Sequence, residues 1–415
     1  MSERDLDQKI ELRTAFWAMG VSTRLDVKLS AIVPRDRGRA GSEEWTDLDL
    51  LAVEYSPLTG LSQSVADCKT VKGRVAERVF WLRGVADLFA ARGVYLTRDD
   101  PLPPSARQLA VRLGISALDA RDRSVLVEQS GTSGLPKAGS FLERGTYQRW
   151  NAMVNMTSKK TERLQRYRTT VFWLVSQHRN LTYLVSEVQR VRGEFDPGTP
   201  SGLAILLDLA WLYLLTLLRA LDDMSRLHLA DTRAGMRFVL LGNEQEAQRQ
   251  EMFADELRRL IAASRSDRGT VKVDVLPDYY EDLAALLSRV ARRRSEATAA
   301  LRTLEFVGTE TIANRGATWV EAFPDASLYG PKLASDVVQF LVSACGLSRD
   351  FLTRFDDHLR QRVAAKTSRP AASTALQASF FEQATAIQLP IVSDEPASAE
   401  SDHGSEGIPP ESTDR

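Results

Sequence analysis

The chain has 415 residues, of which 43% are hydrophobic and 26% are charged. This balance is typical of a soluble globular protein and excludes a wholly disordered or collagen-like chain. The net charge of −1 gives no overall attraction to nucleic acid or to an anionic membrane, so a site for a polyanion must be local. Two cysteines, Cys68 and Cys345, exclude a disulfide scaffold and a four-cysteine zinc site. Because the N-terminus also lacks an apolar signal-peptide core, we expect a cytoplasmic protein.

The length predicts two or three domains. Short helices and strands alternate up to about residue 130, and long helices predominate after it. We therefore expect an α/β domain at residues 1–126, a linker at 127–142 and a mainly helical domain at 143–365. Residues 366–415 are acidic and rich in Ser and Pro, which predicts a disordered tail.

The elements predicted in the first domain follow the order α-β-β-β-α-β-α. Apolar residues at near-helical spacing predict a helix over 8–20, and residues 24–32 alternate like a strand. A hairpin follows, with one strand at 48–55 and a second strand ending at Thr70. The remaining elements of this domain are a helix at 75–91, a strand at 93–97, a helix at 104–113 and a further short strand.

Long helices dominate the prediction for the second domain. They span 143–155, 160–192, 202–229, 331–345 and 348–365. Within this half, residues 236–241 and 271–276 have the composition of strands, with a helix near 245–263 between them and another near 280–297 after them. We therefore predict a small β-α-β unit inside the helical domain.

The segment Gly202–Leu218 is nearly continuous in apolar residues and resembles a membrane span. It is shorter than the roughly 20 residues that a bilayer requires, and Asp208 would lie inside the hydrocarbon. A helix in a protein core can also be apolar on every side. We therefore interpret the segment as a buried helix and expect no membrane partner.

Acidic and basic residues gather on the predicted hairpin. Side chains alternate between the faces of a strand, so Asp67 and Lys69 project together from one face. The partner strand begins with Asp47 and Asp49, and hairpin pairing brings Asp49 beside Asp67. Two converging carboxylates repel unless a cation joins them, and hard oxygen ligands suit Mg²⁺ or Mn²⁺. A neighbouring lysine helps to neutralise charge that grows on a phosphate, so the pattern predicts a metal-dependent phosphodiester hydrolase.

These residues resemble the signature of the PD-(D/E)xK superfamily of restriction-endonuclease-like nucleases. In that signature a metal-binding Asp starts one strand and a (D/E)xK tripeptide lies on the next, as Asp49 and Asp67-Cys68-Lys69 do here. The flanking segments TDLDLLAV and VADCKT look like the Mrr-like branch. The resemblance covers about residues 5–126 and implies the α-β-β-β-α-β core of a restriction-endonuclease-like fold.

The resemblance also implies a role for each site residue. Asp49 and Asp67 would bind Mg²⁺ or Mn²⁺, Glu11 from the first helix would assist them, and Lys69 would stabilise the transition state. The tripeptide has Asp67 where Glu or Gln is commoner in the Mrr-like branch. Asp47 competes with Asp49 for the metal, because the two lie on the same face of one strand.

The expected function is an endonuclease that acts on nucleic acid, with DNA as the expected substrate and a role in restriction or anti-phage defence implied by the resemblance. The alternative is a nuclease fold that has lost its activity and serves as a nucleic-acid-binding or assembly subunit. In either case the helical domain is expected to recognise a target or a protein partner. The sequence leaves the oligomeric state open.

Two weaker signals in the sequence have simpler explanations. Ser130–Gly139 reads SGTSGLPKAG and is similar to the phosphate-binding loop of adenylate-forming enzymes, but the later motifs of that family do not occur. We interpret it as a Gly-rich linker. Arg292–Arg294, with Arg289 nearby, is a candidate phosphate-binding face, although a charged run on a helix is usually only solvated.

Overall fold

The computed structural model describes most of the chain up to residue 364. The described ranges are 3–35, 39–69, 74–135, 139–155, 158–175, 177–226, 231–242, 244–264, 274–313, 316–323 and 330–364. Residues Met1–Ser368 form one compact unit. The tail predicted at 366–415, and residues 271–273 of the second strand predicted in the helical half, lie outside the described residues.

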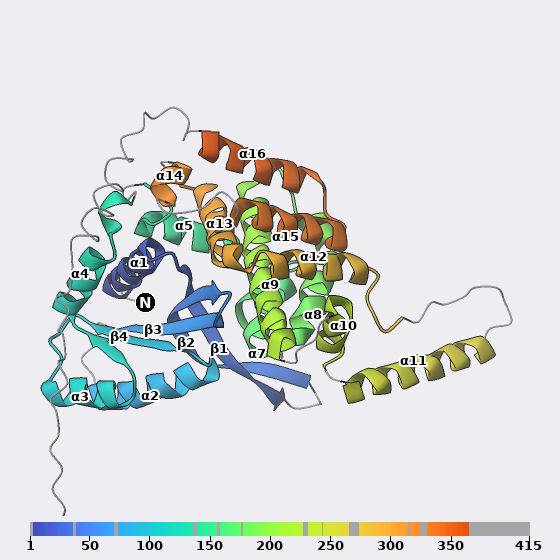
Figure 1. The fold of residues 1–415 in the computed structure, drawn as a ribbon, viewed down its shortest axis with the longest axis horizontal. Coiled ribbons are helices and arrows are strands. Elements are labelled where there is room, and N and C mark those ends of the chain that lie inside the picture. Colours follow the sequence, from blue (N-terminus) through green and yellow to red (C-terminus); the bar gives the residue numbers. More distant parts are fainter. Residues whose placement is uncertain are drawn as a thin grey trace, which may run out of the picture. The chain divides into compact units, whose positions relative to one another are not determined.

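A five-stranded mixed sheet forms the N-terminal part of the fold (Figure 1). Its strands, in spatial as well as sequence order, are β1 (Ser22–Arg35), β2 (Arg39–Ser56), β3 (Gly60–Lys69), β4 (Gly93–Arg98) and β5 (Ser116–Leu118). Strands β1 to β3 pair antiparallel, whereas β4 pairs parallel to β3 and β5 parallel to β4. Strands β4 and β5 each follow a helix, because the chain must cross back to the end of the sheet where the preceding strand began before a parallel strand can start.

Helices cover both faces of the sheet. They are α1 (Glu3–Ala18), α2 (Val75–Leu88), α3 (Pro104–Arg112) and α4 (Ala120–Gln129). Figure 1 shows α1 on one side of the sheet and α2 with α3 on the other. The alternation of β2 explains this, since Leu50 packs in a cluster with Leu12 of α1 whereas Leu51 packs in a cluster with Val79 of α2. The predicted order α-β-β-β-α-β is therefore observed.

The rest of the described chain is mainly helical. Its α-helices are α5 (Arg144–Val154), α6 (Glu162–Arg166), α7 (Phe172–Leu174), α8 (Gln177–Arg190), α9 (Pro200–Arg226), α10 (Thr232–Leu241), α11 (Glu244–Ser264), α12 (Tyr280–Arg292), α13 (Ala297–Glu310), α14 (Trp319–Ala322), α15 (Gly330–Cys345) and α16 (Asp350–Ala364). A π-helix, η3 (Tyr167–Val171), joins α6 to α7, and short 3₁₀ turns lie at η2 (Thr132–Gly134), η4 (Arg192–Glu194) and η5 (Arg294–Glu296). The single helix predicted over 160–192 is thus divided into several elements.

Helix α9 lies at the centre of the helical part (Figure 1). Among the described residues it is the one helix long and apolar enough to cross a membrane by length and composition, and 89% of its apolar window is buried inside the structure. It contacts α8, α13 and α15. Burial among other helices explains why its apolar residues surround the whole helix, as the sequence interpretation proposed.

The predicted β-α-β unit is wrong. Residues 236–241 belong to helix α10, and residues 274–276 form no strand. The Asp231 side chain accepts a hydrogen bond from the backbone N–H of Arg233 and so caps the N-terminus of α10. Gly242, with φ of +92°, ends it. The apolar run is short enough to suit either element, and these two caps decide in favour of a helix.

The sheet and the helices share one hydrophobic core. The Trp17 indole N–H of α1 donates to the carbonyl oxygen of Ala322 at 2.7 Å, and the Tyr55 backbone N–H of β2 donates to Thr298 Oγ1 of α13 at 2.8 Å. Phe141, inside the segment predicted as a linker, is fully buried. Its ring centroid lies 4.8 Å from that of Trp17. The segments predicted at 1–126 and 143–365 therefore stabilise each other.

Candidate active site

Asp49 is a buried carboxylate at the point where β2 and β3 separate. The antiparallel register of the two strands ends at Leu50 opposite Ala66. Just beyond this pair, the backbone N–H of Cys68 donates to Asp49 Oδ2 at 2.7 Å. The carboxylate of Asp49 therefore takes the place of a backbone carbonyl as the hydrogen-bond acceptor for Cys68. Asp49 is only 2% exposed. A buried charge needs such partners, because removal from water is otherwise costly.

Lys69 connects the two predicted aspartates. Its Nζ atom lies 3.7 Å from Asp49 Oδ2 and 3.6 Å from Asp67 Oδ1. Asp67 is fully buried, whereas the Lys69 side chain is 34% exposed. The structure thus brings together three of the four predicted site residues, and Lys69 is the one of these three that is accessible from solvent.

Arg78 of α2 is a second cationic partner of Asp67. Its Nε donates to Asp67 Oδ2 at 2.6 Å, and its Nη2 donates to Asp67 Oδ1. The guanidinium group also lies 3.5 Å from the ring centroid of Trp81. A planar guanidinium that binds both oxygens fixes the orientation of the carboxylate as well as its charge.

Lys9 of α1 bridges Asp49 to a third carboxylate, Asp26 of β1. Lys9 Nζ lies 2.7 Å from Asp49 Oδ1 and 2.5 Å from Asp26 Oδ1, and the side chain of Lys9 is 2% exposed. The Tyr147 hydroxyl donates to Asp26 Oδ2 at 2.9 Å. Asp26 has a φ of +55°, a left-handed backbone conformation that Asp tolerates better than most residues.

Burial and ion pairing together set the pKa values of Asp49 and Lys9. Burial and, to a smaller extent, the nearby Asp67 carboxylate raise the pKa of Asp49 to about 6, against the opposing effect of the Lys9 ammonium. Burial lowers the pKa of Lys9, but the carboxylates of Asp49 and Asp26 outweigh it and hold the value above the ordinary one. The ammonium of Lys9 therefore stays charged at neutral pH.

Glu11 does not join the aspartates. Its Oε2 accepts from Arg123 Nε at 2.6 Å, Arg123 Nη2 lies 2.9 Å from Asp99 Oδ1, and the Glu11 side chain is 51% exposed. The reason is helical geometry. Residues two apart on an α-helix point about 200° away from each other, so Glu11 cannot face the same way as Lys9. The site contribution of α1 therefore comes from Lys9, which sequence reasoning missed.

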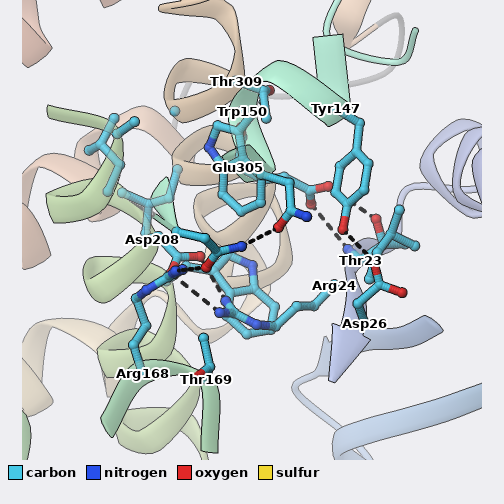
Figure 2. Close-up of a pocket in the computed structure, with 18 of the residues that line it drawn as sticks. Thr23, Arg24, Asp26, Tyr147, Trp150, Arg168, Thr169, Asp208, Glu305 and Thr309 are labelled. Atoms are coloured by element: carbon cyan, nitrogen blue, oxygen red, sulfur yellow. Dashed lines mark hydrogen bonds and ion pairs between the residues drawn. The ribbon is translucent and has the colours of Figure 1, made fainter. Parts of the chain in front are cut away.

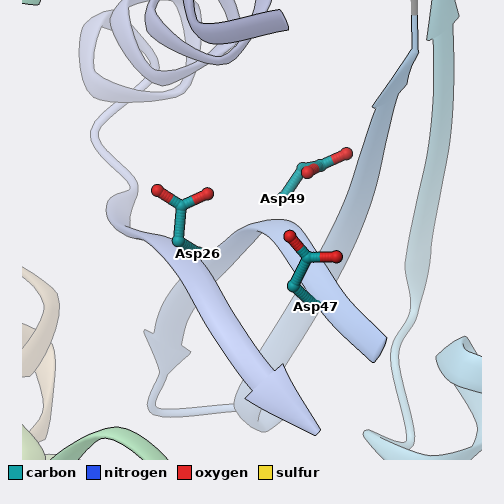
Figure 3. A group of neighbouring side chains, drawn as sticks. All are labelled: Asp26, Asp47 and Asp49. Carbon is teal, nitrogen blue, oxygen red and sulfur yellow. The ribbon is translucent and has the colours of Figure 1, made fainter. Parts of the chain in front are cut away.

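Three carboxylates lie close enough to share a metal ion. One carboxylate oxygen from each of Asp26, Asp47 and Asp49 lies within 4.8 Å of those from the other two (Figure 3). Asp26 is opposite Asp49 because β1 pairs Leu25 with Leu50 of β2. Their donor chemistry fits Mg²⁺ or Mn²⁺, which prefer hard oxygen ligands. A metal there would compete with the Lys9 ammonium, which already contacts Asp26 and Asp49.

The arginine run in the helical part pairs with a carboxylate of its own chain. Arg289 Nε and Arg293 Nη1 lie 3.9 Å and 3.6 Å from Asp336 Oδ2. Lys332 Nζ lies 3.9 Å from the other oxygen, Oδ1. Asp336 is buried, so Arg289 and Arg293 act as counter-charges of this carboxylate, a structural role that the sequence did not predict.

In comparisons with known proteins, no family model, no curated protein and no solved structure matches this chain. The side chains of the site and the sheet that positions them are therefore the features that bear on function.

Proposed function

We propose that the protein is a metal-dependent endonuclease that hydrolyses phosphodiester bonds of nucleic acid, with DNA as the expected substrate and restriction or anti-phage defence as the expected role. The position of Lys69, within 4 Å of the carboxylates of both Asp49 and Asp67, carries the proposal. The α-β-β-β-α-β order and the mixed sheet agree with the PD-(D/E)xK resemblance. The agreement with that superfamily consists of the topology and of Asp49, Asp67 and Lys69.

A bound metal ion, the aspartates and Lys69 would each contribute a different part of the chemistry. A bound Mg²⁺ or Mn²⁺ would supply Lewis acidity and lower the pKa of a bound water. Asp49, with Asp67 or with Asp26 and Asp47, would hold it. Lys69 is partly exposed, so its ammonium can reach a phosphate oxygen and stabilise the negative charge that develops there.

One observation favours the alternative of an inactive nuclease fold that binds nucleic acid or assembles with a protein. Lys9 already pairs with Asp49, and Arg78 already pairs with Asp67 through both oxygens. A buried carboxylate that has such a partner needs no metal for its stability. In this case the helical part would provide the interface with a partner.

A cleavage assay tests the proposal. Purified protein is incubated with plasmid, linear single-stranded DNA and RNA in the presence of Mg²⁺, Mn²⁺ or EDTA, beside Lys69→Ala and the control Lys160→Ala. Lys160 is a matched control, because it is also a lysine that pairs with a carboxylate, Glu194, at 2.7 Å. We expect metal-dependent cleavage that falls roughly 100-fold or more in Lys69→Ala and stays unchanged in Lys160→Ala.

Cleavage that survives Lys69→Ala would show that the activity belongs to another site or to a contaminant. If no substrate is cut under any condition, metal binding separates the two proposals. If calorimetry then shows no Mn²⁺ binding that depends on Asp49, the inactive fold is the better assignment.

A further inference from the structure

A cavity of about 350 Å³ lies between β1 and helices of the other half of the chain (Figure 2). Its wall includes Arg24 from β1, Tyr147 and Trp150 from α5, and Asp208 from α9. Pockets for small organic ligands begin at about 300 Å³, so a ligand about the size of a nucleobase is suited to it. The cavity is separate from Lys69, which does not line it.

Aromatic rings form much of the wall. Trp150, Trp173, Trp211 and Tyr147 all line the cavity. The Arg24 guanidinium lies 5.7 Å from the Trp173 ring centroid and 5.4 Å from the Trp211 ring centroid. Trp150 and Trp173 are only partly buried. Such rings, with a guanidinium plane beside them, offer flat surfaces on which a planar heteroaromatic ligand stacks.

Side-chain amides form a polar edge of the same cavity. Asn155 Nδ2 donates to Asn151 Oδ1 at 2.6 Å, and Gln165 Nε2 donates to Asn155 Oδ1. Amides have a donor and an acceptor side by side, the arrangement that reads the edge of a nucleobase in two hydrogen bonds. Because Asn155 is exposed, this edge is accessible to a ligand from solvent.

The deep charges of the cavity are fixed by ion pairs. Asp208 accepts from Arg24 Nη1 at 2.8 Å and also pairs with Arg168, while Glu305 pairs with Arg13 at 2.9 Å. These groups are therefore held in place before a ligand arrives (Figure 2). Lys28 also lines the cavity, and its side chain is 45% exposed. An ammonium at that position can contact a phosphate that stays in solvent.

We propose that this cavity is a nucleobase-binding site, in which the base stacks among the tryptophans, the amides of Asn151, Asn155 and Gln165 contact its edge, and its phosphate lies toward Lys28. The base belongs either to a free nucleotide or to a nucleotide unstacked from a nucleic acid strand. This inference does not depend on nuclease activity. It gives the helical half, which contributes most of the wall, a role in ligand recognition.

Calorimetry tests the site directly. The full-length protein carrying Lys69→Ala, in EDTA, is titrated with AMP, GMP, CMP and UMP, with a single-stranded 12-mer DNA, and with ribose 5-phosphate, which has a phosphate but no base. The same titrations use Trp150→Ala, Trp150→Phe and Trp45→Ala, where Trp45 is an exposed tryptophan outside the cavity. Far-ultraviolet circular dichroism confirms that each variant is folded.

We expect at least one base-containing ligand to bind and ribose 5-phosphate to bind at least tenfold more weakly. Trp150→Ala should weaken binding about tenfold or more, because the base loses a stacking surface. Trp150→Phe and Trp45→Ala should stay within about threefold of the parent. Binding of mononucleotides identifies a free nucleotide as the source of the base, and binding of the 12-mer alone identifies a nucleic acid strand. The proposal is overturned if no base-containing ligand binds or if folded Trp150→Ala binds as tightly as its parent.

Discussion

Lys9 and Asp49 form an ion pair that is almost completely removed from solvent. The Nζ to Oδ1 distance is 2.7 Å, and each side chain is 2% exposed. Helix α1 supplies the lysine and strand β2 the aspartate, so the pair connects the first helix to the sheet. The net contribution of such a pair to stability is small, but loss of one partner is costly because the other remains buried and charged.

Replacement of Lys9 by methionine should therefore destabilise the protein. We expect Lys9→Met to lower the free energy of unfolding by about 3–5 kcal/mol in urea denaturation at pH 7. The control Lys28→Met removes an exposed pair with Glu44 and should cost less than about 1 kcal/mol. Equal losses in both variants would mean that burial of the Lys9 pair has no energetic consequence.

Divalent metal should partly reverse the Lys9→Met defect. Without the Lys9 ammonium, the Oδ1 atoms of Asp26 and Asp49 can bind Mg²⁺ or Mn²⁺ without competition from Lys9, and a ligand that binds only the folded state stabilises it. We expect 10 mM Mg²⁺ to raise the melting temperature of Lys9→Met more than that of the parent. An equal effect of Mg²⁺ on both proteins would argue against a metal at this position.

Cleavage should fall in acid, with a midpoint near the pKa of Asp49. Burial raises that pKa to about 6, and only the ionised carboxylate can bind a metal. We expect the rate to decline as the pH falls below about 6, up to tenfold per pH unit. Because the Lys9 ammonium holds the pKa down, Lys9→Met should move the midpoint to higher pH, whereas Lys160→Met, which removes an ion pair with Glu194, should not. A midpoint that stays fixed in Lys9→Met would exclude Asp49 as the titrating group.

Glu310 should make stability depend on pH near neutrality. Burial raises its pKa from 4.5 to about 7, although backbone N–H donors from Ala317 and Phe141 and the charge of Arg362 oppose the shift. A raised pKa in the folded state means that its contribution to stability is fully present below about pH 4.5 and is lost as the pH rises through about 7. The free energy of unfolding of the parent, relative to Glu310→Gln, should thus fall by up to roughly 3 kcal/mol between pH 4.5 and 8. A constant difference across that range would contradict the shift.

Loss of Asp208 should destabilise the contact between β1 and α9. It pairs with Arg24 and Arg168, which outweigh the effect of its burial and hold its pKa below the ordinary value. We expect Asp208→Asn to lower the free energy of unfolding by about 3–5 kcal/mol, because both guanidinium groups lose their counter-charge. The surface variant Asp357→Asn should change it by less than about 1 kcal/mol. Chemical denaturation at neutral pH measures both.

The sequence predicted the parts of the site that depend on local geometry. Strand alternation and hairpin pairing were sufficient to place Asp49, Asp67 and Lys69 together, since neighbouring strands align residues in a fixed register. Lys9 and Asp26 could not be predicted in the same way. Their positions depend on how α1 packs on the sheet and on the left-handed backbone at Asp26. The spacing of residues in the sequence predicts neither feature.

The errors in the helical half have a local cause. A six-residue apolar run at 236–241 suits either a strand or a helix, and the Asp231 cap was the signal that distinguished them. Helix α13 was also missed, although Thr298, Arg302, Glu305 and Thr309 recur in it at helical spacing; most of its residues are buried, polar ones such as Arg302 among them. Long helices such as α9 were easier to predict, because length excludes a strand.

The indole of Trp17 and the carbonyl of Ala322, 305 residues apart, share a buried hydrogen bond. A truncated chain that ends near residue 126 would keep Asp49, Asp67 and Lys69 but would lose the partners of Trp17, Arg24 and Tyr55. Its apolar face would be open to water and would promote aggregation. Inactivity of such a fragment would therefore report on its folding and not on its chemistry, and biochemical work is best done with the intact polypeptide.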